Sequence, residues 1–543
     1  MSKKIETVTT SQVSEYFSKN LGQVGMSNPT KSVLTAIREF LDNSLDSAEE
    51  MGILPEISVE IEKLGPGIAK NTDKVRIRVS DNAAGIEEKY VGNAFGQFLS
   101  SSRAYRGRIS RGKQGIGGSM ILVYAQLTQA RGGEIITKTA KDKKAFSCLV
   151  EVDIKNNIGV VKEGKRIDWD RPHGTSVEVV MDGKVQVNGD AGVLTYLIGT
   201  SIVNPHLKLT YKLPDMEQVT IERTSDYVPV IPDAVDPHPH TLKLGEFISH
   251  GHLYHNLKVK DWLKNTFSRV NDSAIQTIAK EKDLKPLLSK NVDIMGEKDY
   301  KSLYSFIQNM KLPAPSTRSV MAIGEENLSK SVKNLGEVDF FSVITRDPTI
   351  CDMKPVQVEV AIARLTTTGE SDRPAQVLRF ANRVPLQFDK GNDVSIHAIE
   401  SVNWKAYGLN QPKGSIPTGP FIFCVSIISP FIAFKNASKE TIDASDELLE
   451  EVRRALIQAG QKLAKFVKKE AREEDLERKR QYIEMFSPIL IDCLFELSGE
   501  PKSRRVKIQK GLSKILGRDT EEAEQAVEKQ NLKIEKEVRN GKK

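Results

Sequence analysis

The sequence has few cysteines and no long apolar run. Its four cysteines are scattered without a paired spacing, which fits a reducing compartment and offers neither a disulfide framework nor a zinc motif. No stretch of about 18 consecutive apolar residues occurs, and the polar, charged N-terminus lacks the pattern of a signal peptide. We therefore expect a soluble, intracellular protein with no membrane segment.

A strong charge of one sign is also missing. The 79 Lys and Arg and 72 Asp and Glu leave a net charge of +7, which permits DNA binding but does not indicate it by itself. Histidines gather between positions 238 and 255, but no Cys or acidic residue stands at ligand spacing, so a metal site there is disfavoured. At 543 residues the chain is too long for one hydrophobic core, and we expect roughly two to four domains.

An amphipathic helix is predicted over residues 34–48, where apolar residues recur at steps of three and four. Glu39 and Asn43 are four residues apart and share one face of this helix. A solvated acidic face, with Asp42 and Asp46, is the plain alternative. However, Asn is a poor residue for a helix interior, and its oxygen suits Mg²⁺. A carboxylate one turn earlier can polarise a water for attack on a phosphate.

Two further segments complete a candidate nucleotide site. Residues 74–80 alternate apolar and polar, which predicts a half-buried strand ending at Asp81, a carboxylate able to accept a hydrogen bond from adenine. A turn Asp without function is the alternative. Residues 111–118 are rich in glycine and lead into an apolar helix over 120–127, so backbone N–H groups can approach phosphate oxygens.

A P-loop is rejected, although residues 107–114 nearly spell one. Gln114 stands where the Mg²⁺-binding Ser or Thr belongs, and no apolar strand precedes the segment.

The order of these motifs resembles the four sequence boxes of the GHKL ATPases. This superfamily includes gyrase-type topoisomerase subunits, MutL, the ninety-kilodalton heat-shock chaperones and histidine kinases. The motifs that carry the resemblance are Glu39 with Asn43, Asp81 to Gly85, Arg111 to Gly118, and His173-Gly174-Thr175.

The resemblance implies a site for ATP and Mg²⁺. It makes Glu39 the general base, Asn43 the Mg²⁺ ligand, Asp81 the reader of adenine, and residues 111–118 the ATP lid. The other positions that it places at the nucleotide are Gly85, Ser102, Arg103, Arg111, Gly112, Lys113, Gln114, Gly115, Ile116, Gly117, Gly118, Thr175 and Lys413.

Motifs further along are similar to those of one family, the topoisomerase VI B subunits. They are residues 117–128 after the lid, 237–247 at the entry to a helix–two-turns–helix domain, and 379–386 and 408–420 in a transducer domain. The resemblance implies that Lys413 is a switch lysine reaching the γ-phosphate.

Two positions depart from the family pattern. The family usually has Gly at position 83, where this chain has Ala, so the contact with adenine is open to a shift. Ser102-Arg103 stands where the family has Ser-Lys, and Arg keeps the charge but changes its geometry.

The predicted architecture is a multidomain α/β protein. It comprises a GHKL (Bergerat) α/β sandwich with an N-terminal strap, a helical helix–two-turns–helix domain, an α/β transducer domain of the ribosomal S5 domain 2-like type with a long C-terminal helix, and a charged tail. The predicted limits are 1–229, 230–315, 316–500 and 501–543. An apolar patch over 486–495 follows a long charged helix and is predicted to dock a partner chain, with a small local core as the alternative.

The resemblance implies the ATPase chain of a type IIB topoisomerase. It implies an A₂B₂ heterotetramer with a separate topoisomerase VI A subunit, which would carry the DNA-cleaving tyrosine, and double-stranded DNA as substrate for relaxation and decatenation. ATP binding would dimerise the ATPase domains with exchange of the strap, residues 11–28, in a prokaryotic cytoplasm at the nucleoid. A MutL-like or chaperone-like ATP clamp is the alternative. A histidine kinase is disfavoured because no segment long enough for a phospho-acceptor helix precedes Glu39.

Overall fold

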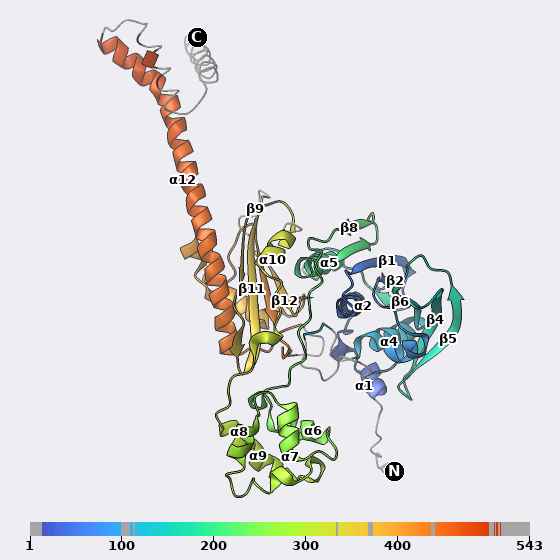
Figure 1. The fold of residues 1–543 in the computed structure, drawn as a ribbon. Coiled ribbons are helices and arrows are strands. Elements are labelled where there is room, and N and C mark those ends of the chain that lie inside the picture. The colour runs from blue at the N-terminus through green and yellow to red at the C-terminus, as the bar shows by residue number, and fades with distance from the viewer. Residues whose placement is uncertain are drawn as a thin grey trace, which may run out of the picture. The chain divides into compact units, whose positions relative to one another are not determined.

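The computed structural model divides into two compact units, Met1–Leu463 and Ala464–Lys543. It describes residues 13–98, 109–111, 115–189, 191–332, 335–366, 373–435 and 440–498, together with Arg504, Lys507, Ile508 and Gly511. Figure 1 shows two separate β-sheets in the first unit, with a helical segment that follows the first sheet in the chain.

The first sheet has eight strands in the order β5-β4-β3-β6-β2-β1-β7-β8. Neighbouring strands are antiparallel except for the parallel pair β1 and β7. The strands are β1 (Glu56–Pro66), β2 (Asp73–Ser80), β3 (Gly133–Lys138), β4 (Ala145–Asp153), β5 (Ile158–Ile167), β6 (Gly174–Gly183), β7 (Lys208–Lys212) and β8 (Val219–Ile221).

Helices cover one face of this sheet. In β2, Val75, Ile77 and Val79 are buried on that face, whereas Arg76 and Arg78 form ion pairs with glutamates on the other. An antiparallel sheet with one covered face gives this alternation. The helices packed with it in one hydrophobic core are α2 (Pro29–Glu50), α3 (Glu88–Gly96), α4 (Gly117–Gln129) and α5 (Val193–Val203) (Figure 1).

The predicted helices over 34–48 and 120–127 and the strand over 74–80 are confirmed as parts of α2, α4 and β2. Helix α2 starts where the Asn28 side chain accepts a hydrogen bond from the Lys31 N–H at 2.9 Å, with Pro29 in the first turn. This cap satisfies one free N–H group at the helix start. Before it lie α1 (Val13–Lys19) and η1 (Leu21–Val24), within the predicted strap; residues 11 and 12 lie outside the described part.

The helical segment has a hydrophobic core of its own, built around Phe247, Trp262 and Tyr300. Its histidines make structural hydrogen bonds: His240 lies 2.8 Å from the Ile307 carbonyl, and His250 accepts from the Trp262 indole at 3.2 Å. The segment contains η2 (Pro239–Thr241), α6 (Leu244–His252), α7 (Val259–Thr266), α8 (Asp272–Ile278), η3 (Leu287–Ser289), η4 (Val292–Ile294) and α9 (Glu297–Asn309).

The second sheet has the strand order β10-β11-β14-β12-β13, with β9 also paired to β11. Its elements are η5 (Thr317–Ser319), α10 (Glu325–Val332), β9 (Val338–Thr345), β10 (Thr349–Cys351), β11 (Lys354–Leu365), β12 (Gln376–Ala381), β13 (Val384–Leu386), η7 (Lys390–Asn392), α11 (Val394–Ser401), η8 (Trp404–Tyr407), β14 (Phe421–Ile428) and α12 (Asp446–Ser498).

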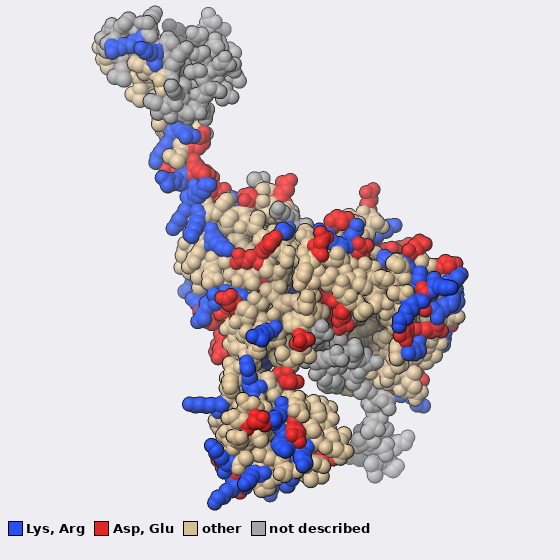
Figure 2. Space-filling view, viewed as in Figure 1, with Lys and Arg blue, Asp and Glu red and all other residues tan. Residues whose placement is uncertain are grey.

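Helix α12 changes character along its length. Its first part is anchored in the first unit, where Val452, Leu456 and Leu463 are buried and Glu451 binds Arg346 at 2.7 Å. Beyond residue 463 it is mostly exposed and carries both charge signs (Figure 2). The side chains at 494 and 495, part of the predicted docking patch, lie outside those described. Within the described residues, no helix has the length and apolarity needed to cross a bilayer.

Candidate functional site

The predicted base lies against the start of the helix after the lid. Glu39 is largely buried on α2, with its side chain 15% exposed, and Arg38 lies 3.4 Å from its carboxylate. A Cβ added at Gly117 would collide with the Glu39 carboxylate. Only glycine permits this approach, so the structure brings the α2 carboxylate and the first residue of α4 together. Asn43 is half-buried one turn after Glu39.

The predicted adenine reader is held by three hydrogen bonds. Asp81 Oδ2 accepts from the Ser44 hydroxyl at 2.7 Å, and Oδ1 accepts from the Ala83 and Thr175 N–H groups, each at 2.9 Å. Burial raises the pKa of the Asp81 carboxyl, although these three bonds oppose the rise. Helix α2, the turn after β2 and the start of β6 therefore converge on one buried carboxylate.

Ser44 was not predicted from the sequence as a site residue, although it lies five residues after Glu39 on the same helix. Neither charge nor periodicity distinguishes it, because small polar residues are common in helices. Its role becomes visible only once β2 is placed beside α2.

The turn after Asp81 depends on two glycines. Gly85 has φ +73° and would, with a Cβ, collide with the Lys138 carbonyl; Gly174 has φ +137° and would collide with the Asp81 carbonyl. Ala83, by contrast, is buried without a positive φ, and its carbonyl lies 2.8 Å from His173 Nδ1. Alanine is therefore accommodated at position 83 without backbone strain.

Part of the predicted lid can be placed. Gly115 has φ +62°, and α4 begins after Ile116 with no side chain capping its first turn. Free N–H groups at a helix start are available to an anion. Gly118 follows Gly117 in that turn. The predicted positions Ser102, Arg103, Gly112, Lys113 and Gln114 lie outside the described residues.

Arg111 is turned into the protein. Its guanidinium donates to Asp46 Oδ1 at 2.7 Å, to both Glu49 oxygens at 2.7 and 2.9 Å, and to Asn204 Oδ1 at 2.5 Å. The side chain is only 3% exposed. Asp42 and Asp46 are buried as well, so the solvated acidic face considered for this helix is wrong.

Glu49 is the centre of a buried charge network. Burial alone would raise the pKa of the Glu49 carboxyl, but Arg111 and Arg383 hold it well below its usual range. Arg383 Nη2 lies 3.0 Å from Glu49 Oε1, and His206 Nε2 lies 2.9 Å from the same oxygen. His206 Nδ1 faces Arg383 Nη2 at 3.4 Å and can accept its hydrogen bond in the tautomer with the proton on Nε2.

The predicted switch lysine lies apart from these residues. Lys413 is exposed in the loop between η8 and β14, which is held by hydrogen bonds of the buried Gln411 to Trp404 and Ser415. Among the described residues, it forms no hydrogen bond or ion pair with Glu39 or Asp81.

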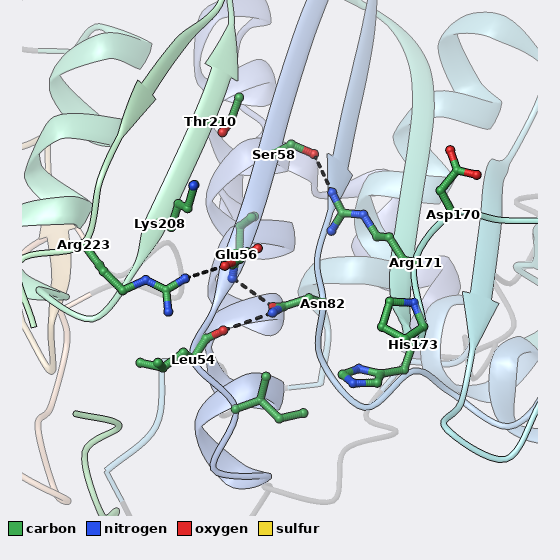
Figure 3. Close-up of a pocket in the computed structure, with 13 residues that line it drawn as sticks. Leu54, Glu56, Ser58, Asn82, Asp170, Arg171, His173, Lys208, Thr210 and Arg223 are labelled. Carbon is green, nitrogen blue, oxygen red and sulfur yellow. Dashed lines mark hydrogen bonds and ion pairs between the residues drawn. The ribbon is translucent and has the colours of Figure 1, made fainter. Parts of the chain in front are cut away.

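A cavity of about 620 Å³ lies beside the turn over residues 81–85, which we call the adenine turn after the predicted role of Asp81 (Figure 3). The Asn82 side chain accepts from the Glu56 N–H at 2.9 Å and donates to the Leu54 carbonyl at 3.0 Å, which ties this turn to the start of β1. Arg223 is paired with Glu56 at 2.7 Å across the cavity. Its lining includes Asn82 but not Glu39, Asn43 or Asp81, so this cavity is distinct from the predicted nucleotide site.

The class of protein follows from this geometry and from a family match. Residues 29–158 match the family described as histidine kinase-, DNA gyrase B- and HSP90-like ATPase. These residues contain α2, the adenine turn and α4. The N-terminal domain is therefore a GHKL ATPase domain.

Comparison of the whole chain identifies the family within this class. Residues 315–479 match the transducer of the topoisomerase VI B subunit. The chain is 33% identical to the B subunit of type 2 DNA topoisomerase 6 from Methanococcoides burtonii, over 93% of this chain and 79% of that protein. It is 30% identical to the B subunit of the same enzyme from Pyrococcus abyssi, over 91% of this chain and 92% of that protein. This chain belongs to the family of type 2 DNA topoisomerase 6 B subunits.

Solved structures resemble the chain more weakly. The B subunit of DNA gyrase from Myxococcus xanthus has a TM-score of 0.39 and 14% identity, over 84% of this chain and 95% of that one. The family relatives give no support to the MutL-like or chaperone-like alternative.

The geometry of Asp81 predicts a loss of nucleotide binding in Asp81→Asn. The amide oxygen can still accept from Ala83 and Thr175, but an NH₂ group at the Oδ2 position would face the amine of adenine. We expect ATP to bind roughly a hundredfold more weakly, because two donors then oppose each other. The melting temperature should shift by only a few degrees, since the neutral side chain removes a buried charge.

Titration calorimetry with ATP and thermal unfolding test this prediction. Asp182→Asn is the matched control, because Asp182 is a buried carboxylate at the other end of β6 that also accepts a backbone N–H, from Ala69 at 2.8 Å. Equal ATP affinity in Asp81→Asn and the native chain would contradict the adenine role.

The His206 environment predicts acid sensitivity of the fold. Burial lowers the pKa of His206 from 6.5 to about 4, and Arg383 adds to the effect. The unfolded chain thus takes up this proton first as the pH falls, so the free energy of unfolding should decrease between pH 6.5 and 4, by about 3 kcal/mol from this group. Denaturant unfolding against pH measures it. His206→Gln, which keeps a donor and an acceptor, should flatten the slope; parallel pH curves would refute the assignment.

Proposed function

We propose that this chain binds and hydrolyses ATP between α2, the adenine turn and the start of α4, and that this hydrolysis times the passage of a DNA duplex. The observation that carries the proposal is the convergence on α2 of Gly117, packed on Glu39, and Asp81, bound by Ser44. Two motifs far apart in the sequence thereby meet on the helix that carries the third.

In the proposed reaction Glu39 accepts a proton from the attacking water. Its side chain is partly buried, and the Arg38 guanidinium lies 3.4 Å from its carboxylate. Asp81 holds the adenine amine, while the glycines of residues 115–118 let backbone N–H groups approach the phosphates.

The residues present at the proposed site are compatible with a Mg²⁺ ion whose ligands come mainly from the nucleotide and water. Asn43 offers one amide oxygen, and among the described residues no group of three or more His, Cys, Asp or Glu forms a cage for a metal. Mg²⁺ prefers octahedral oxygen ligands and usually keeps several waters and substrate phosphates in its shell. When bound, the ion would neutralise charge on the phosphate oxygens.

We propose that ATP binding closes two copies of this chain and that Lys413 then reaches the γ-phosphate. In a single chain α1 rests on its own body, with the Ser14 hydroxyl bound to the Ile154 carbonyl at 2.5 Å. Exchange of the segment 11–28 would replace such contacts by equivalent ones in a second copy. The domain limits stay the predicted ones.

We propose the topoisomerase VI A subunit as the partner, in an A₂B₂ assembly that acts on double-stranded DNA. The support on this chain is a set of exposed apolar side chains on the distal part of α12, including Met485, Phe486, Ile489 and Leu490. Exposed apolar residues at this density favour a protein interface.

Glu39→Gln should separate binding from turnover. We expect hydrolysis to fall about a hundredfold or more, because general-base catalysis is lost, while ATP affinity and ATP-induced dimerisation persist. Phosphate release and sedimentation measure the two effects. The control is Glu50→Gln, an exposed carboxylate at the end of the same helix. Unchanged turnover in Glu39→Gln would assign the base elsewhere.

The complete function is tested with a candidate A subunit. The native pair should co-purify and relax and decatenate DNA with ATP, whereas the pair carrying Glu39→Gln should not turn over. A native pair that forms no complex and passes no DNA would leave only an ATP clamp.

Lys413→Ala should reduce hydrolysis and strand passage about tenfold or more, since a charge at the developing phosphate transition state is removed. Because Lys413 is exposed, the melting temperature should not change. Lys405→Ala, an exposed lysine in the preceding η8, is the control. Normal hydrolysis in Lys413→Ala would show that another residue is the switch.

A further inference from the structure

The cavity of about 620 Å³ beside the adenine turn has no part in the proposed function (Figure 3). Ser58 of β1 and its partner Thr210 of β7 line it. Successive residues of a strand point to opposite faces, and the neighbours Val59 and Leu209 are buried in the core under the helices. The cavity therefore opens on the face of the sheet away from α2. Its volume is that of a site for a small molecule.

Three cations from separate segments surround this cavity. Arg171 lies before β6, Lys208 begins β7, and Arg223 follows β8. Figure 3 shows the Arg171 and Arg223 side chains directed inward from the two sides of the cavity. Glu56 and Asp170 also line it, so three Lys and Arg face two carboxylates and leave an excess of one positive charge.

Arg171 is the cation whose charge is not neutralised at the cavity. Arg223 is paired with Glu56 at 2.7 Å. Arg171, in contrast, forms no ion pair within the part of the chain that the structure describes, and its Nη2 donates to the Ser58 hydroxyl at 3.4 Å. A guanidinium can bind a carboxylate or a phosphate through two parallel hydrogen bonds. One long bond to a hydroxyl uses only part of that capacity.

Lys208 is a second group that can turn toward an anion. Its ion pair with Glu222 is 3.1 Å long, and the two side chains are 36% and 67% exposed. Exposed ion pairs contribute little to stability, so exchanging this carboxylate for another anion costs little. Lys208 and Arg171 lie on different segments, so together they can approach one oxyanion from two directions.

Another part of the cavity wall is apolar. Ile53, Leu54 and Pro172 line it, and the first two are half-buried (Figure 3). Apolar walls with a few well-placed polar groups are typical of sites for small organic ligands. A ligand with an oxyanion at one end and an apolar body would contact both parts of the wall.

A DNA backbone is a poorer occupant of this face. Beyond Ser58, the same face of β1 carries the exposed Glu60 and Glu62, which form ion pairs with Arg78 and Arg76 of β2. Duplex binding requires several phosphates to be neutralised along a continuous basic surface. The alternating charges here favour one local anion over a polyanion.

We propose that this cavity binds a small organic anion: Arg171 and Lys208 hold its carboxylate or phosphate group, and Ile53, Leu54 and Pro172 pack on its apolar body. The site is separate from the proposed ATP site and does not depend on ATP hydrolysis by this chain.

The cavity is nevertheless joined to the adenine turn. Asn82 lines the cavity and directly follows Asp81. His173, two residues after Arg171, donates from Nδ1 to the Ala83 carbonyl at 2.8 Å. Binding at the cavity must therefore be measured with and without a nucleotide.

Phenyl phosphate and benzoate are suitable probes, because each joins an apolar ring to one oxyanion. Saturation-transfer NMR titration of the full chain at constant ionic strength measures their binding. The native chain should bind at least one of them with a Kd on the order of 1 mM, as is usual for about ten non-hydrogen atoms. Comparison of the two distinguishes phosphate from carboxylate. Phenol, which lacks the charge, should bind about tenfold more weakly or less.

Substitutions of the two cations locate the probe. Arg171→Gln should weaken its binding about tenfold, because charge-assisted hydrogen bonds are lost, and Lys208→Gln should weaken it about threefold. Arg171→Lys keeps the charge without the planar fork and should be intermediate. If Arg171→Gln does not fold, as its melting temperature would show, Lys208→Gln decides.

Arg76→Gln is the matched control. Arg76 is an arginine on the same face of the sheet, ion-paired with Glu62, but it does not line the cavity. Its loss should leave the Kd within about twofold of the native value, because a distant exposed charge is screened. Saturating ADP should likewise leave the Kd of the probe within about twofold.

Four results would overturn the proposal. They are absence of probe binding to the native chain, equal binding of phenol, native affinity in the folded Arg171→Gln and Lys208→Gln chains, and displacement of the probe by ADP, which would place it in the nucleotide site. Displacement by a short DNA duplex would assign these cations to DNA and overturn it too. A native chain that binds the probe but hydrolyses no ATP would refute the proposed function alone.

Discussion

The buried carboxylate of Glu49 is the constraint on which the arrangement of this protein depends. Removing an ion from water costs several kcal/mol, and only close, well-oriented partners offset that cost. Here they are Arg111, Arg383 and His206, which arrive from the lid, the transducer and the loop before β7. Loss of either Arg111 or Arg383 would leave Glu49 with a single cation at its buried carboxylate. The segment at Arg111 and the transducer turn at Arg383 are thereby joined at one buried carboxylate.

Helix α2 connects Glu49 with the proposed catalytic site, because Glu39 lies on the same helix. Glu39 precedes Glu49 by ten residues, which is roughly 15 Å along a helix. Between the two ends, Ser44 binds Asp81 and so fixes β2 to the same helix. The proposed base lies on this helix, and the proposed adenine reader and Arg111 both bind to it.

Much of this could be predicted from local sequence patterns. Apolar periodicity places α2, β2 and α4, and the glycines at 85 and 174 are where the backbone requires them. The ion pair between Glu49 and Arg383 could not be predicted from these patterns. The two residues are 334 positions apart, and an ion pair produces no periodic pattern in the sequence. Asp46 and Arg111 illustrate the same limit. As charged residues, both are expected in solvent or at a ligand. In the structure they are buried as an ion pair.

The proposed contact of Lys413 with the nucleotide and the observed contact of Arg383 with Glu49 differ in their physical properties. Lys413 is exposed, so it remains hydrated and can engage or release a phosphate without leaving an unpaired charge behind. Arg383 is 3% exposed, and burial lowers its pKa to about 10, so it stays charged at neutral pH and must keep its partners. A contact that is easily broken suits a response to the presence of the γ-phosphate. A contact that is costly to break suits the transfer of that response as a rigid movement, and the proposed timing of a gate by ATP hydrolysis would require both.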